Sequence, residues 1–100
     1  MYEIKALPGA RGNERQGRRY AVVIQSNRFS TSTITVALTS TSAGPAIYRP
    51  DIDLDGTKTR VLTDQIHSVA STRLGRFMGA LGAGELAELD QALMLRLGLI

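Results

Sequence analysis

The sequence has no cysteine, no tryptophan and a single histidine, His67. The absence of cysteine excludes disulfides and thiolate metal sites, and one histidine cannot make a histidine-rich site. No stretch approaches the roughly 18 consecutive apolar residues that a membrane-spanning helix needs. The first residues also lack the apolar core of a secretory signal. We therefore expect a cytoplasmic protein with no metal, no cofactor and no membrane partner.

Positive charge is carried mainly by arginine and is gathered near the N-terminus. The 100 residues have a net charge of +3, and ten of the twelve basic residues are arginine. Arg11, Arg15, Arg18 and Arg19 lie within nine positions. A guanidinium can hold a phosphate through two parallel hydrogen bonds, which an ammonium cannot do. The cluster favours a phosphate-bearing partner such as nucleic acid, but a solvated charged loop would have the same composition.

Length and hydrophobic pattern predict one small domain, 1–100, in which short strands precede a helix. A core of this size is modest and benefits from oligomerisation. β-Branched and alternating runs predict strands, and runs rich in glycine and proline predict the connections. The strands expected are 2–7, 19–25, 33–39, 46–54, 59–62, 64–69 and 77–81, with a loop over 8–18, a turn at Asp55-Gly56 and a helical turn within 71–76. In the run 33–39 we expect one buried face, formed by Ile34, Val36 and Leu38.

The C-terminal segment has the pattern of an amphipathic helix. Leucines recur at spacings of three and four, which places them on one side of a helix; they are Leu86, Leu89, Leu93 and Leu97. Gly82 is an acceptable N-cap, with Glu85 three residues later. We expect this leucine stripe to pack in the core or in a dimer interface.

Four segments carry the most specific information in the sequence. Residues 12–26 read Gly-Asn-Glu-Arg-Gln-Gly-Arg-Arg-Tyr-Ala-Val-Val-Ile-Gln-Ser, a polar loop that runs into an apolar strand. Residues 35–40 read Thr-Val-Ala-Leu-Thr-Ser, and residues 61–68 read Val-Leu-Thr-Asp-Gln-Ile-His-Ser. The fourth segment is the end of the chain, 93–100. In this order and with this spacing, the four segments resemble the MazF/PemK (Kid) family of toxins over nearly the whole chain.

The resemblance implies both a fold and an activity. The fold is α+β and mainly β: a twisted, SH3-like antiparallel barrel with a C-terminal helix, assembled as a homodimer. The activity is metal-independent, sequence-selective cleavage of single-stranded RNA, which inhibits translation and growth. The ribose 2′-OH attacks the adjacent phosphorus, leaving a 2′,3′-cyclic phosphate and a 5′-OH. The implied protein partner is a cognate antitoxin, whose disordered segment docks in the RNA groove.

Two residues match the catalytic pair of the family. Arg19 stands where the loop meets the second strand, and a guanidinium is a poor general base because it does not lose its proton at neutral pH. We expect it to stabilise the charge of the phosphorane and to assist the leaving oxygen. Thr39 ends the third strand, where its hydroxyl can donate to a phosphate oxygen and hold the phosphate in line.

Nine further residues are expected to contact RNA: Asn13, Glu14, Arg15, Gln16, Arg18, Tyr20, Asp64, Gln65 and His67. Glu14 is also a candidate proton acceptor, and Tyr20 is a candidate platform on which a base could stack. A solvated loop carboxylate is the alternative for Glu14, a turn or capping carboxylate for Asp64, and a simple surface side chain for His67.

Departures from the family pattern leave other functions open. Tyr20 replaces the proline that usually follows the key arginine. The Arg-Gly-Asp or Arg-Gly-Glu that usually precedes the first strand has no counterpart before Tyr2, so either translation starts further upstream or the first strand is short. One alternative is a gyrase-binding toxin of the CcdB type, but this chain lacks the C-terminal Trp-Gly-Ile of that branch. Another is an inactive paralogue that binds RNA or sequesters antitoxin.

Overall fold

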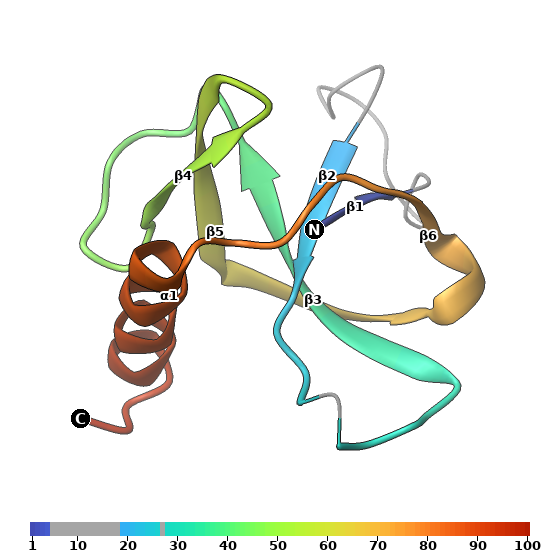
Figure 1. Ribbon diagram of the computed structural model, residues 1–100. Helices are drawn as coiled ribbons and strands as arrows, with labels where there is room; N and C mark the ends of the chain where they lie inside the picture. The colour runs from blue at the N-terminus through green and yellow to red at the C-terminus, as the bar shows by residue number, and fades with distance from the viewer. Residues whose placement is uncertain (5–18, 27) are drawn as a thin grey trace, which may run out of the picture.

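A curled antiparallel sheet of six strands forms the body of the protein (Figure 1). The structure is a computed structural model, which describes residues 1–4, 19–26 and 28–100. The strands follow the order β4-β5-β3-β2-β1-β6 across the sheet, and every neighbouring pair is antiparallel. They are β1 (Tyr2–Ile4), β2 (Arg19–Val23), β3 (Thr33–Ser40), β4 (Asp51–Leu54), β5 (Thr57–Ala70) and β6 (Leu74–Phe77). The predicted mainly β architecture with a C-terminal helix is confirmed.

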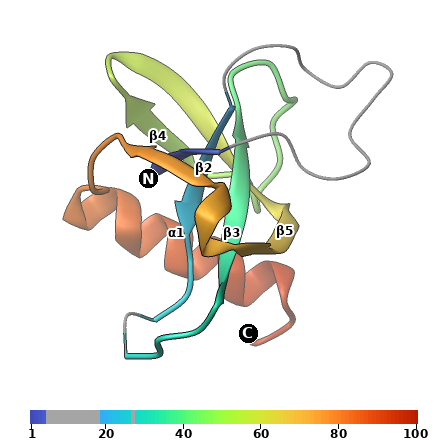
Figure 2. The same cartoon turned by 90° about the vertical axis from the view of Figure 1, so that its right-hand side faces the viewer.

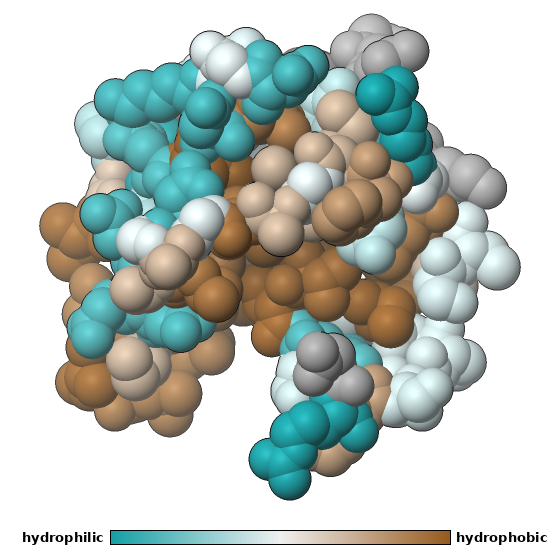
Figure 3. All heavy atoms as spheres, viewed as in Figure 1, coloured by the Kyte–Doolittle hydropathy of each residue, from teal (hydrophilic) through white to brown (hydrophobic). Residues whose placement is uncertain are grey.

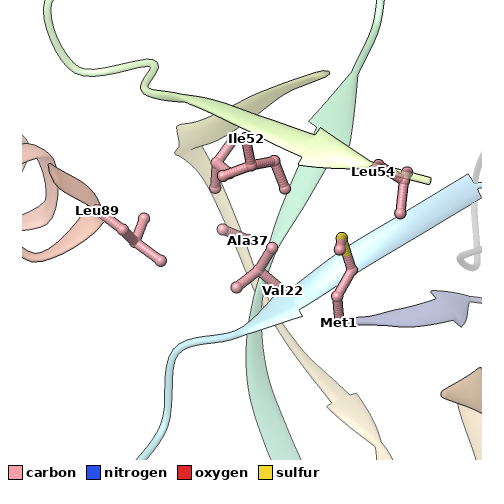
Figure 4. Packing of buried hydrophobic residues seen from close by; sticks show 7 residues of the cluster. Met1, Val22, Ala37, Ile52, Leu54 and Leu89 are labelled. Carbon is pink, nitrogen blue, oxygen red and sulfur yellow. The ribbon is translucent and has the colours of Figure 1, made fainter. Parts of the chain in front are cut away.

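One hydrophobic cluster fills the space between the sheet and the helix α1 (Ala83–Arg96). Figure 2 shows α1 running along one side of the sheet. In Figure 4 the buried side chains of the cluster converge from the helix, the strands and the N-terminus; those labelled are Met1, Val22, Ala37, Ile52, Leu54 and Leu89. Leu89 is the helix residue at the centre of this packing, with 2% of its surface exposed.

A second cluster lies on the other face of the same strands. Its buried members are Ile4, Ala21, Val36, Leu38, Leu62 and Val69. The expectation of a single buried face for 33–39 is therefore wrong, because Ala37 is fully buried in the first cluster while Val36 and Leu38 are buried in the second. β3 lies between β2 and β5 in a sheet with packing on both sides, so its two alternating sets of side chains are both covered.

The helix α1 is tied to the sheet at its first turn. Gly82 is the N-cap, as predicted, and its N–H donates to Oε1 of Glu85 at 2.9 Å. The second oxygen of the same carboxylate accepts the N–H of Asp53 in β4 at 2.7 Å. These two hydrogen bonds stabilise the ionised form and lower the pKa of Glu85. Glu85 therefore both satisfies the free end of the helix and fixes its position on β4.

The expected leucine stripe is only partly buried. Leu89 and Ala92 are the buried residues of α1, whereas Leu86 is 49% exposed and Leu97, which follows the last helical residue, is 57% exposed. In the space-filling view, hydrophobic residues gather over α1 and across the centre of the face, and hydrophilic ones over the β4–β5 hairpin (Figure 3). Among the described residues, no helix is long and apolar enough to cross a membrane.

β5 is one long strand where the sequence predicted two shorter ones. It spans the expected segments 59–62 and 64–69 without interruption. Its register against β3 changes between Ala37, which faces Ile66, and Leu38, which faces Leu62. Residues 63–65 therefore form a bulge, which bends the strand and changes the direction of its side chains. The pattern 59–69 reads as two pieces because the alternation breaks at this bulge.

Of three other predicted elements, two need correction and one, the helical turn, is confirmed. The strand expected over 46–54 is regular only at Asp51–Leu54, since a turn closed by the Arg49 N–H and the Ala46 carbonyl, 3.0 Å apart, precedes it. The helical turn within 71–76 is the 3₁₀ helix η1 (Ser71–Arg73). The strand expected at 77–81 is displaced to Leu74–Phe77, where it pairs with β1. Pairing with β1, which lies far away in the sequence, fixes the position of β6, and the local pattern does not reveal it.

Candidate active site

A cavity of about 220 Å³ opens where β2 begins and β3 ends. Both residues predicted to be catalytic, Arg19 and Thr39, line it. The register places Ala21 opposite Leu38, so Tyr20 stands opposite Thr39 at the end of the paired segment. Alternation sends the side chains of residues 19 and 20 to opposite faces of the sheet, so Arg19 and Thr39 approach the cavity from different faces. The fold thus brings together two side chains that lie on separate strands.

Thr39 is held by a hydrogen bond across the strand pair. Its Oγ1 donates to the carbonyl oxygen of Tyr20 at 2.9 Å, and the side chain is half-buried. A threonine hydroxyl has one proton and two acceptor lone pairs. The proton is therefore committed to the backbone in this structure, while the oxygen keeps acceptor capacity.

The turn between β4 and β5 supplies another wall of the cavity. Leu54, Asp55, Thr57 and Thr59 line it from this side, and Met78 lines it from the segment after β6. Asp55 has φ of 53°, in the left-handed region, and is followed by Gly56 with φ of 85°. The Asp-Gly pair signalled this turn in the sequence. The sequence did not indicate that the turn would stand beside Arg19 and Thr39.

Tyr20, the predicted platform for base stacking, packs partly against the hydrophobic core. Its side chain is half-buried against the cluster between the sheet and α1, and it also lines the cavity. A ring that packs on the core has less free surface for a base. Tyrosine is accommodated at the family's proline position because Tyr20 belongs to a regular strand, paired with Glu3 of β1.

Asp64 makes a bidentate ion pair with Arg49. Its two carboxylate oxygens accept from Nε and Nη2 of Arg49 at 3.1 and 2.8 Å, and both side chains are mostly buried. These hydrogen bonds lower the pKa of Asp64 and raise that of Arg49. Arg49 also donates to the carbonyl of Gly44 at 3.1 Å and lies 5.9 Å from the ring centre of Tyr48. Arg96 of α1 also contacts this ring, with its guanidinium carbon 5.3 Å from the same centre.

The remaining predicted RNA contacts fall into two groups. Gln65 and His67 are exposed on β5, and His67 faces Val36, three residues along β3 from Thr39. Neither lines the cavity of Arg19. The other five lie outside the described residues; they are Asn13, Glu14, Arg15, Gln16 and Arg18. Within 1–4, 19–26 and 28–100, no group of three or more His, Cys, Asp or Glu side chains could hold a metal ion.

Comparisons with known proteins agree with this fold and with the sequence motifs. Residues 2–97 match the family of PemK-like, MazF-like toxins of type II toxin–antitoxin systems. The chain is 40% identical over 100 residues to Rv3098A/RVBD_3098A of Mycobacterium tuberculosis, covering 99% of this chain and 94% of that protein. It is 34% identical over 105 residues to Endoribonuclease MazF9 of the same organism, covering 93% of this chain and 89% of that protein.

A solved structure of low sequence identity has the same fold. It is described as an endoribonuclease in complex with its cognate antitoxin, from a mycobacterial species. The TM-score is 0.79 at 16% identity, with 99% of this chain and 91% of that chain covered. At this identity the likeness concerns the fold, whereas the family match extends over nearly every residue. The chain therefore belongs to the PemK/MazF-like toxins of type II toxin–antitoxin systems.

Proposed function

We propose that this toxin is an endoribonuclease that cleaves single-stranded RNA at short sequences, without a metal ion, in the cytoplasm. The observation that carries the proposal is the shared cavity of Arg19 and Thr39, the two positions that match the family's catalytic residues. The relative named Endoribonuclease MazF9, 34% identical over most of both chains, supports the same activity. Cleavage of cellular RNA would inhibit translation and growth.

In the proposed reaction the ribose 2′-OH attacks the neighbouring phosphorus and the 5′-oxygen leaves. The products are a 2′,3′-cyclic phosphate and a 5′-OH. Arg19 stabilises the negative charge that develops on the phosphorane, because a guanidinium donates to two of its oxygens at once. It stays protonated throughout, and its role is electrostatic stabilisation with assistance to the leaving oxygen.

Thr39 contributes by positioning the phosphate. To donate to a phosphate oxygen, its hydroxyl rotates away from the carbonyl of Tyr20. This exchanges a neutral hydrogen bond for one to an anion, which is about twice as strong. The exchange favours the bound state only when a phosphate is present, so the same hydroxyl holds the strand end together in the free protein.

The proton acceptor for the 2′-OH is assigned to no described residue. Asp64 is engaged by Arg49 and does not line the cavity, so we give it no part in proton transfer. Glu14 is the carboxylate that the motif suggests, and it lies outside the described residues. Its replacement by glutamine therefore tests the assignment through the pH profile of cleavage.

The toxin is proposed to act as a homodimer that a cognate antitoxin inhibits. Exposed apolar side chains gather on α1, on the segment that follows it and on the loop beside it, which suits a protein interface; they are Ile47, Leu86, Leu95, Leu97, Leu99 and Ile100. The solved endoribonuclease of the same fold is described in complex with its cognate antitoxin. Family membership in type II systems supports such a partner for this chain.

A cleavage assay tests the proposal. Purified protein is incubated with mixed-sequence single-stranded RNA in EDTA, and the fragment ends are mapped for 5′-OH and cyclic phosphate groups. We expect cuts at one short motif in the chelator. An intact RNA pool with a folded wild-type protein would refute the endoribonuclease. Cuts that require added magnesium would refute the metal-independent mechanism alone.

A further inference from the structure

The aromatic residues divide between two parts of the molecule. Tyr20 packs against the core, and Tyr48 contacts the guanidinium groups of Arg49 and Arg96. The other three lie together at the opposite end of the sheet; they are Tyr2, Phe29 and Phe77. Phe29 is 64% exposed and Phe77 is 57% exposed, which is unusual for such large apolar rings. We call this region, residues 1–4, 25–26, 28–34 and 71–77, the aromatic end.

Two of the three rings of the aromatic end line one groove, and the third contacts one of them. The rings of Tyr2 and Phe77 are 5.1 Å apart between centres and inclined at 58°, a favourable tilted contact. Tyr2 and Phe29 both line a groove of about 340 Å³, together with the aliphatic side chains of Val23, Ile34 and Leu74. Polar side chains of the connection between β2 and β3 line it as well, so the groove combines aromatic, aliphatic and polar surface. Its volume is within the usual range for a small-molecule site.

Positive and negative side chains are also distributed unequally between the aromatic end and the rest of the described residues. Among the described residues, the aromatic end contains Arg28, Arg73 and Arg76 and a single carboxylate, Glu3. The other seven described carboxylates lie in residues 43–64 and α1, which we call the hairpin end. Several carboxylates of the hairpin end form ion pairs; Asp51, for example, pairs with Lys58 and Arg60. The aromatic end is thus the part of the described surface that suits an anion.

The aromatic end is continuous with the proposed catalytic residue. Arg19 pairs with Ile4, and Tyr2 pairs with Ala21, so Tyr2 is two residues along β1 from the partner of Arg19. Paired residues project from the same face of an antiparallel sheet, and residues two apart share that face. Arg19 and Tyr2 therefore project from one face, about 7 Å apart along the strand. Phe77 extends this face, because it pairs with Tyr2 from β6.

We propose that single-stranded RNA stacks its bases on the aromatic end as the strand leaves the cavity of Arg19. Tyr2 and Phe77 hold one base, and Phe29 holds another at the groove. Aromatic faces recognise unpaired bases of any sequence, and the neighbouring arginines neutralise the phosphates between them. The inference rests on the proposed function, since it adds a binding surface to the same cleavage site.

A second copy of the chain is the other occupant that aromatic and arginine side chains would suit. In a two-fold contact, Arg28 and Arg76 would face the same positive surface on the partner. Like charges held against each other weaken such an interface. A polyanion removes this repulsion, so the charge of the aromatic end favours RNA over self-association.

The test measures binding separately from cleavage. The probe is a fluorescent single-stranded 2′-O-methyl RNA of mixed sequence, which lacks the attacking hydroxyl and stays intact. A second probe has the same backbone without bases. Phe77→Leu and Phe29→Leu retain an apolar side chain and remove the aromatic face. We expect each to weaken binding of the first probe by roughly 5- to 100-fold. Binding of the abasic probe should not change.

Two matched charge variants test the segregation. Arg76→Gln removes one positive charge from the aromatic end, and Lys58→Gln removes one from the hairpin end. A lost phosphate contact reduces the slope of log affinity against log salt by about 0.7 for a single strand. We expect that reduction for Arg76→Gln and an unchanged slope for Lys58→Gln. Equal slopes in the two variants would contradict the assignment of phosphates to the aromatic end.

The outcomes separate this inference from the proposed function. Wild-type cleavage of unmodified RNA, with both leucine variants binding the first probe as tightly as wild type, overturns the inference alone. Loss of binding in those variants, with a wild type that cleaves nothing, overturns the endoribonuclease and keeps the surface. If Phe77→Leu dissociates the dimer in sedimentation and leaves RNA affinity unchanged, the aromatic end is an interface between copies. Phe29→Leu, on an exposed connection, keeps the test valid if Phe77→Leu unfolds.

Discussion

The hairpin end and the aromatic end use the same residue types for different purposes. In the hairpin end, Arg49 and Arg60 donate to carboxylates and backbone carbonyls, and a carboxylate of α1 accepts from β4. In the aromatic end, one carboxylate accompanies three arginines, and two phenylalanines are more than half exposed. Charges paired within the fold position the chain, whereas an excess of one sign on the surface attracts a partner of the opposite sign. Mutations in the two ends should therefore affect stability and activity differently.

The largest effect is expected at the junction of the two ends. Arg19→Ala should reduce the rate of RNA cleavage by about 100- to 1000-fold or more, because it removes the donor to the phosphorane. The proposed dimer should survive. Single-turnover cleavage and sedimentation measure the two properties. Arg96→Ala removes an arginine from the hairpin end and serves as the control, with cleavage retained. An Arg19→Ala protein that cleaves at the wild-type rate would eliminate the mechanism.

The core of the hairpin end should be the most sensitive to truncation. Leu89→Ala removes a side chain that is 2% exposed and should lower the free energy of unfolding by about 2–5 kcal/mol. Leu86→Ala, on the same helix but 49% exposed, should cost about 0.5 kcal/mol or less. Urea denaturation compares the two variants. Equal losses would mean that α1 packs through a different face.

Breaking the ion pair between Arg49 and Asp64 should have an intermediate effect on stability. Asp64→Ala leaves the mostly buried guanidinium of Arg49 without its bidentate partner and should cost about 2 kcal/mol of stability. Asp64→Asn keeps one acceptor and should cost less. Thermal melts measure this difference. A variant of full stability that binds RNA weakly would instead favour the prediction that Asp64 contacts RNA.

Acid should weaken the hairpin end before it affects the rest of the fold. The pKa values of Asp64 and Glu85 are lowered by hydrogen bonds to their ionised forms. Their contribution to stability is full above their ordinary pKa values, about 4, and is lost as the pH falls through the lowered values. Each loss should be smaller than that of Asp64→Ala, because a protonated carboxyl still accepts a hydrogen bond. Unfolding free energies from pH 7 to 3 test this, and the combined variant Asp64→Asn, Glu85→Gln should flatten the profile.

The smallest effect is expected at the exposed rim of the hairpin end. Lys58 lies 3.3 Å from Asp51, and its side chain is 73% exposed. Exposed pairs of this kind contribute little, so Lys58→Gln should change stability by about 0.5 kcal/mol or less. Chemical denaturation at low and at high salt provides the measurement. A large loss would show that charges in the hairpin end act as a network.

Prediction from the sequence was accurate where local chemistry decides the structure. Gly82 and Glu85 define the start of α1 through capping, and Asp55-Gly56 defines the hairpin turn through positive φ. Prediction was inaccurate where long-range pairing decides. The bulge at 63–65 and the position of β6 depend on β3 and β1, which are distant in sequence. The period of a segment cannot reveal which strand it will join.

In the candidate site, too, the sequence identified some residues correctly as neighbours and could not reveal the contacts of others. The motifs indicated Arg19 and Thr39, and the fold brings them to one cavity. The motifs also indicated Asp64 and Tyr20, which the fold engages with Arg49 and with the core. The importance of Phe77 and Phe29 could not be inferred from the sequence, since an isolated aromatic residue is more often part of a core.

The sequence by itself determined the family and the helix and suggested a candidate catalytic pair, because these depend on residue identity at fixed local spacing. Only the tertiary structure decided which cations lie beside the carboxylates of the hairpin end and which gather with the exposed rings of the aromatic end. Strand order places β1 and β6 together at one edge of the sheet and β4 and β5 at the other. This order is set by burial of two hydrophobic clusters on opposite faces, a property of the whole chain. The separation of the aromatic end from the hairpin end is therefore a consequence of folding.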